Sequence, residues 1–106
     1  MTKLRLKVVK IALHQDLIDE YLKPDHFPEG FQACDRFSEG QGFLFHEFPT
    51  RPEDFRCEWA WAELLRDISM VWNGGQTPWM KRNGTLLTCC SDGFRPVTFL
   101  IERIED

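Results

Sequence analysis

The 106-residue chain lacks the sequence motifs that would assign it to a familiar class of enzyme. It has no Cys-x-x-Cys pair, so the usual zinc-knuckle and thioredoxin-like motifs are missing. A Gly-rich phosphate loop, a Gly-x-Ser-x-Gly elbow and a His-Glu-x-x-His helix are missing as well. Classical hydrolase and kinase activities are therefore without support.

Long apolar runs and an excess of positive charge are also absent. No stretch approaches the roughly 18 consecutive apolar residues of a membrane-spanning helix. Lys7 and Lys10 interrupt the segment in which a signal peptide would need an apolar run. The formal net charge is −4, which argues against nucleic-acid binding through phosphate neutralisation. We therefore expect a cytoplasmic protein that binds neither a membrane nor nucleic acid.

The composition is that of a folded domain. Hydrophobic residues make up 42% of the chain and charged residues 28%, as in ordinary globular proteins. The length fits one domain over residues 1–106, which is long enough to bury a core without disulfides or metals. In a reducing cytoplasm, the four cysteines are expected to be free thiols, metal ligands or redox groups rather than two disulfides.

The clearest pattern in the sequence is an amphipathic helix over residues 58–72. Its apolar residues recur at three- and four-residue steps, and its polar residues fall on the opposite side. Asn73-Gly74-Gly75 supplies a residue that can adopt a positive φ just after the last turn. The predicted centre of the core is the apolar stripe of Trp61, Leu64, Leu65, Ile68, Val71 and Trp72.

Alternating apolar and basic residues predict a half-buried strand over residues 3–13, which loses its phase at Val9. Its basic residues are explained more simply by a solvated strand face than by a binding patch. A short helix near residues 16–22 stops before Pro24. Further strands are predicted over residues 42–48, 85–90 and 96–104, the last two forming an antiparallel hairpin.

This order of elements, β-α-β-α-β-β, predicts an α+β fold. We expect a small, mostly antiparallel sheet with one long amphipathic helix packed across it.

The candidates for a metal or thiol site are Cys34, Cys57, Cys89 and Cys90. Cys57 opens the predicted long helix, and the positive end of a helix favours the thiolate, which is the form that binds metals or attacks. Adjacent strand residues point to opposite faces, so only one of Cys89 and Cys90 joins Cys57 unless the strand ends before Cys90. The alternative is that the cysteines are small buried apolar side chains.

The metal that such a cysteine site would hold is a thiolate-bound ion such as zinc or iron. His26 lies in the loop that carries Cys34 and would be the fourth ligand. The alternative for His26 is a solvated loop histidine.

Two further features are candidates for binding. Asp92 and Arg95 lie in a turn whose amides, together with Arg95, would hold an anion. The alternative is an Asp-Gly turn in which Arg95 pairs with a carboxylate such as Glu58 or Asp92. Trp59 and Trp79 lie off the core stripe, so we expect at least one to be partly exposed near a concave surface, where it would contact a partner.

These motifs together resemble a family of small prokaryotic proteins of about a hundred residues and of unknown function, which occur alone or as tandem repeats. The resemblance covers nearly the whole chain. It rests on Cys57-Glu58-Trp59-Ala60-Trp61, Gly74-Gly75, Pro78-Trp79-Met80, Cys89-Cys90-Ser91-Asp92-Gly93-Phe94-Arg95-Pro96-Val97 and Ile101-Glu102-Arg103-Ile104.

Members of this family also carry a cysteine, often followed by proline, before a Phe-x-x-Gly-x-x-Phe turn. Here Cys34 is followed by Asp35 and then by the turn from Phe37 to Phe43. The resemblance implies that the cysteine positions are a family feature, and it implies no particular activity.

The sequence supports three hypotheses on function. The first is a cysteine-lined site that binds a metal or performs thiol chemistry. The second is a non-catalytic interaction module with structural cysteines, whose exposed tryptophans meet a partner protein or a second copy of the chain. The third is an enzyme whose small anionic substrate is held by Arg95. The first and third hypotheses allow catalysis, and the second excludes it.

Overall fold

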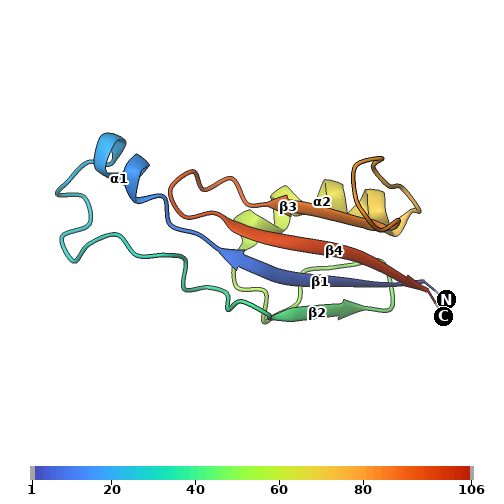
Figure 1. The fold of residues 1–106 in the computed structure, drawn as a ribbon. Coiled ribbons are helices and arrows are strands. Elements are labelled where there is room, and N and C mark those ends of the chain that lie inside the picture. Colours follow the sequence, from blue (N-terminus) through green and yellow to red (C-terminus); the bar gives the residue numbers. More distant parts are fainter. Residues whose placement is uncertain (1, 106) are drawn as a thin grey trace.

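The computed structural model describes residues 2–105 and arranges them in the order β-α-β-α-β-β (Figure 1). The elements are β1 (Thr2–Ile11), α1 (Gln15–Tyr21), β2 (Gly42–Phe45), α2 (Glu58–Trp72), β3 (Thr85–Cys89) and β4 (Val97–Glu105). The predicted α+β class and the predicted order are confirmed. The first strand ends two residues earlier than predicted, and the second ends three residues earlier, at Phe45.

The strands of the described residues form one antiparallel sheet in the order β2-β1-β4-β3. The two longest strands, β1 and β4, lie in the middle and pair along nearly their whole length. Their register shifts between Val8 and Lys10, so Val9 is the extra residue of a bulge at the point where the alternation in the sequence loses its phase. The predicted hairpin of β3 and β4 is confirmed.

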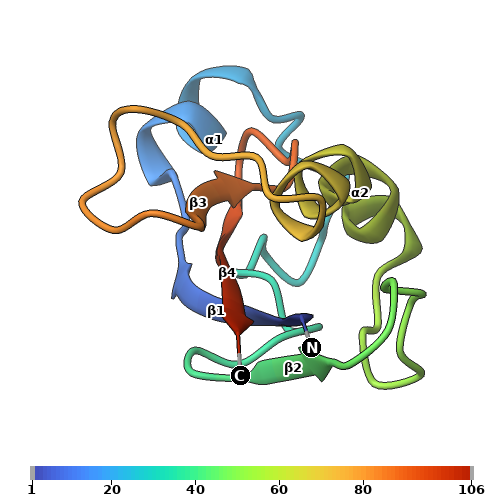
Figure 2. The ribbon, with the colours of Figure 1, turned by 90° about the vertical axis from the view of Figure 1, so that its right-hand side faces the viewer.

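The core lies on one face of the sheet, the face beside α2 in Figure 2. Leu4, Leu6 and Val8 of β1 are fully buried and belong to the same cluster as Leu64 and Ile68 of α2. Each such side chain contributes about 1.5–3 kcal/mol when it is fully buried. Aromatic rings complete the cluster, namely those of Phe37, Phe43, Phe45, Phe55 and Phe99.

The apolar stripe of α2 differs in part from the prediction. The buried line of the helix consists of Ala60, Leu64, Ile68 and Val71. The prediction that Leu65 is a core residue is wrong, because its side chain is only half-buried. It is rotated by about 100° from Leu64 on the helix, which takes it away from the sheet. Trp61 and Trp72 are half-buried and pack against the margin of the core.

The end of α2 is fixed by the two glycines that the sequence placed there. Gly74 adopts a φ of +91°, and its N–H donates to the carbonyl of Val71 at 3.1 Å. The N–H of Gly75 donates to the carbonyl of Met70 at 2.8 Å, which is the hydrogen-bond pattern of a Schellman motif. A Cβ atom at Gly75 would lie 2.8 Å from the Met70 carbonyl oxygen, so the close approach requires glycine.

Candidate functional site

Cys57 is the N-cap residue of α2. Its extended backbone precedes the first helical residue, and its Sγ accepts a hydrogen bond from the N–H of Ala60 at 3.3 Å. One of the otherwise unpaired N–H groups of the first turn is thereby satisfied. The sulfur occupies the position that a serine or aspartate oxygen takes in most helix N-caps, so Cys57 has a structural role in this fold.

Cys89 and Cys90 lie on different sides of the sheet, as the geometry of a strand predicts. Cys89 is exposed, and it pairs with Thr98 on the face away from the core. Cys90 follows the end of β3 and packs against the core. Its Sγ accepts a hydrogen bond from the N–H of Val97 at 3.3 Å. Of these two residues, only Cys90 lies on the side of the sheet that Cys57 shares.

Cys34, Cys57 and Cys90 all contact the same buried cluster. Hydrogen bonds also join their neighbouring residues. The Arg36 guanidinium donates to the carbonyl of Arg56 at 2.8 Å, beside Cys34 and Cys57. Within residues 2–105, no group of three or more His, Cys, Asp and Glu side chains has an arrangement that could hold a metal ion. His26 is exposed, and its ring packs edge-on against Phe27.

Glu63 connects α2 to the end of β3. Its carboxylate accepts the N–H of Ser91 at 3.1 Å. The pKa of Glu63 is lowered below its ordinary value of 4.5, mainly by a hydrogen bond from the Ser91 hydroxyl. Slight burial of the carboxyl group acts in the opposite direction. Hydrogen bonds from the Ser91 N–H and from the Trp59 side chain lower the pKa further. The start of α2 is therefore held beside the Cys-Cys segment by an ionised carboxylate.

Asp92 and Arg95 form the turn that the sequence offered as an alternative to an anion site. Asp92 accepts the N–H groups of Phe94 and Arg95 through one oxygen, at 3.0 and 3.1 Å, and the Arg95 guanidinium through the other, at 3.1 Å. The guanidinium also lies over the Phe31 ring, 4.6 Å from its centre. Arg95 thus has two partners inside the chain, and it braces Phe31 against the turn.

Trp59 and Trp79 are both strongly exposed, with 74% and 73% of their surfaces accessible. Trp59 projects from the first turn of α2, and Trp79 lies in the loop between α2 and β3. Their predicted exposure is confirmed, and their position near a concave surface and their contact with a partner stay predictions.

The face of the sheet opposite the core carries a surface that the sequence analysis did not select. We call it the open face, because no helix lies over it in the described part of the chain. Its basic side chains on β1 are Lys3, Arg5, Lys7 and Lys10. Its apolar side chains are Leu44, Leu87, Leu100 and Ile104. The alternation of basic and apolar residues in β1 is the sequence signal for this surface, although the same alternation also fits a solvated face without a partner.

Glu102 lies at the centre of the open face and is the buried acid of the sheet, with 4% of its surface accessible. One of its oxygens accepts two hydrogen bonds from the Arg5 guanidinium, both at 3.1 Å. The other oxygen pairs with Arg82, which reaches over from the loop before β3. Lys7 and Lys10, farther along β1, form no ion pair within residues 2–105.

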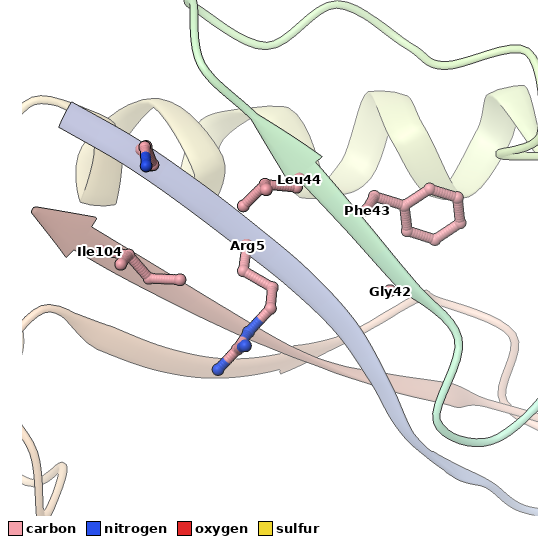
Figure 3. Close-up of a pocket in the computed structure, with 6 residues that line it drawn as sticks. Arg5, Gly42, Phe43, Leu44 and Ile104 are labelled. Atoms are coloured by element: carbon pink, nitrogen blue, oxygen red, sulfur yellow. The ribbon is translucent and has the colours of Figure 1, made fainter. Parts of the chain in front are cut away.

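A hollow of about 300 Å³ lies on the open face beside Arg5 (Figure 3). Arg5 of β1, Leu44 of β2 and Ile104 of β4 line it, together with Lys3, Gly42 and Phe43. Leu44 is 54% exposed, and Leu87, farther along the face, is 53% exposed. The hollow therefore combines apolar walls with a guanidinium, which is a composition suited to protein contacts.

No protein-family model, curated protein or solved structure matches the chain. The resemblance to the small prokaryotic family stays a prediction. None of the helices in residues 2–105 combines the length and apolar character that a membrane crossing needs.

Proposed function

We propose that this chain is a cytoplasmic, non-catalytic interaction domain that binds a protein surface through its open face. The observation that carries the proposal is the composition of that face. Two leucines, Leu44 and Leu87, are about half exposed, and the lysines beside them, Lys7 and Lys10, lack an ion pair within the described chain. A complementary surface would present apolar and acidic side chains.

The roles of the chemically reactive side chains support this proposal. The sulfurs of Cys57 and Cys90 accept backbone hydrogen bonds, and Arg95 is engaged by Asp92 and Phe31. Each of these groups has a structural use. The open face, in contrast, offers charged and apolar groups that the chain itself leaves available to a partner.

Site-specific photo-crosslinking in cells tests the proposal. A photoreactive amino acid would replace Leu44 or Leu87 on the open face, and Ala62, which is exposed on α2, would be the matched control position. We expect a defined adduct, identified by mass spectrometry, at positions 44 and 87 and not at 62.

The charge of the face provides the second arm of this experiment. The double substitution Lys7→Glu and Lys10→Glu should reduce the yield of the adduct at position 87 by at least about tenfold, because like charges would then face the acidic partner. Equal yields at positions 87 and 62, or a yield that the charge reversal does not change, would contradict binding through the open face.

A second candidate function is a thiol or metal site formed by Cys34, Cys57 and Cys90. Their shared contact with one core cluster favours it. In this case, protein purified without chelator should contain zinc or iron, and Cys57→Ser should reduce that content. If the sulfur serves only as a helix cap, the serine variant should keep its stability, because serine is a preferred N-cap residue, whereas Cys57→Ala should lose about 0.5–2 kcal/mol.

A further inference from the structure

Residues 12–33 form a projecting arm that contains α1 and the loop returning toward β2 (Figure 1). At its base, the N–H of His14 donates to the carbonyl of Phe94 at 2.8 Å, and the Phe31 ring packs edge-on against the Phe94 ring. Within the described chain, α1 lies against no other helix or strand. The radius of gyration is 15.4 Å, whereas a compact chain of this length has about 13 Å.

The arm exposes several large apolar side chains. Tyr21 is 73% exposed, and three others are more than one-third exposed: Leu13, Leu17 and Phe27. A hollow of about 250 Å³ lies between α1 and the loop that follows it. A segment that leaves the body of a domain and keeps apolar groups in water is typical of one that packs against another molecule.

The charge of the arm is opposite to that of the open face. Of the 17 acidic and 13 basic side chains in the sequence, five acidic and one basic lie in the arm, so the remaining residues carry twelve of each sign. The net negative charge of the whole chain therefore resides in the arm. Its acidic residues are Asp16, Asp19, Glu20, Asp25 and Glu29.

We infer that the partner of the open face is a second copy of this chain, whose acidic arm packs on the face. This inference rests on the proposed interaction function and names its partner. The arm supplies acidic and exposed apolar side chains, and the open face supplies Lys7, Lys10 and exposed leucines. Opposite charges and apolar groups thus meet on both sides of the contact.

The shape of the molecule fits a reciprocal exchange of arms. In Figure 1, the arm extends beyond the end of the sheet, past the C-terminal end of β1 and the start of β4, so it can reach a second copy of the chain. Two copies related by a two-fold axis would each place their arm on the other's open face. Both contacts would then be identical, and the dimer would leave neither face available for a third copy.

Light scattering coupled to size-exclusion chromatography tests this inference on the full chain. We expect a dimer at low salt whose dissociation constant rises with ionic strength, because the contact joins exposed charges. A face variant, Lys7→Glu with Lys10→Glu, and an arm variant, Glu20→Lys with Glu29→Lys, should each weaken dimerisation by at least about tenfold. Circular dichroism would check that both variants remain folded.

Mixing the two variants is the decisive step. The basic arm of one variant would meet the acidic face of the other, and the acidic arm would meet the basic face, so a one-to-one heterodimer should form at low salt. The matched control is Arg56→Glu with Arg66→Glu, which changes two exposed arginines outside the arm and the open face. This control carries the same net charge as the face variant and should dimerise like the parent chain. It should pair with the arm variant less tightly than the face variant does.

The outcomes separate this inference from the function on which it rests. A parent chain that stays monomeric at low salt, or variants that dimerise like the parent, would overturn the exchange of arms. If crosslinking at position 87 then captured a different protein, the interaction function would stand with another partner. If position 87 gave no more adduct than position 62, the function itself would fail.

Discussion

At the scale of single residues, carboxylates that accept several hydrogen bonds hold together the segments around the turn at residues 92–95. Burial alone would raise the pKa of Asp92, but the N–H groups of Phe94 and Arg95 and the Arg95 guanidinium lower it below the ordinary value of 3.8. A carboxyl group with a lowered pKa adds stability above its ordinary pKa, and that stability is lost as the pH falls through the folded-state value. Asp92 should therefore stabilise the fold at neutral pH and cease to do so in acid.

Asp92→Asn tests this role. We expect the free energy of unfolding near neutral pH to fall by on the order of 1 kcal/mol, since the amide cannot pair with Arg95 and accepts weaker hydrogen bonds. Solvent screens part of the effect because the side chain is 36% exposed. Urea denaturation should show the difference from the parent chain shrinking as the pH falls below 3.8. A difference that persists unchanged in acid would contradict the assignment.

At the scale of elements, α2 supplies the helical half of the core through one line of residues. Leu64 is fully buried, and Leu65, its neighbour, is half-buried and outside the core cluster. The two leucines have equal volume and equal helix propensity, so they form a matched pair. Any difference between their alanine variants reports packing alone.

Leu64→Ala should lower the free energy of unfolding by about 2–5 kcal/mol, because it removes buried methyl groups and leaves a cavity. Leu65→Ala should cost about 1 kcal/mol or less, as expected for a partly exposed side chain that leaves no cavity. Chemical denaturation of both variants measures the two values. Equal losses would mean that the helix packs on the sheet through a different face.

The elements were predictable from the sequence where their signals are local. The three- and four-residue spacing of α2, the glycines after it and the alternation in β1 and β4 each depend on neighbouring residues. Leu65 was wrongly predicted to lie in the core, because the stripe of six apolar residues on α2 is wider than the line of residues through which the helix contacts the sheet. The faces of Cys89 and Cys90 followed from strand geometry.

Other features depend on contacts between distant segments, and no local pattern specifies them. The sulfur of Cys90 accepts the N–H of Val97 only because the hairpin returns there. The open face is the face of the sheet that no helix covers, and the path of the loops determines where the helices lie. The alternation of Lys3, Arg5 and Lys7 predicted which side chains lie on that face, but the burial of Glu102 among arginines required the register of three strands.

At the scale of the whole molecule, the part of the chain that projects from the body is also the part that carries the net charge. The body carries equal numbers of acidic and basic residues, and the projecting arm carries the net negative charge. An acidic arm is attracted to the basic residues of its own open face. It therefore stays extended only while its base is held in place. The Phe31–Phe94 contact and the cation–π contact of Arg95 supply that brace, so the turn at residues 92–95 sets the direction of the arm.

Small-angle X-ray scattering tests the position of the arm in the single chain. At high salt and low concentration, contacts between copies are screened, and the radius of gyration should remain near the 15.4 Å of the extended arm, apart from the contribution of bound water. Phe31→Ala removes the ring that Arg95 and Phe94 contact, so it should broaden the distribution of distances without unfolding the sheet. A parent-chain value near 13 Å, the size of a compact domain of this length, would mean that the arm folds back onto its own body and leaves nothing to offer a second copy.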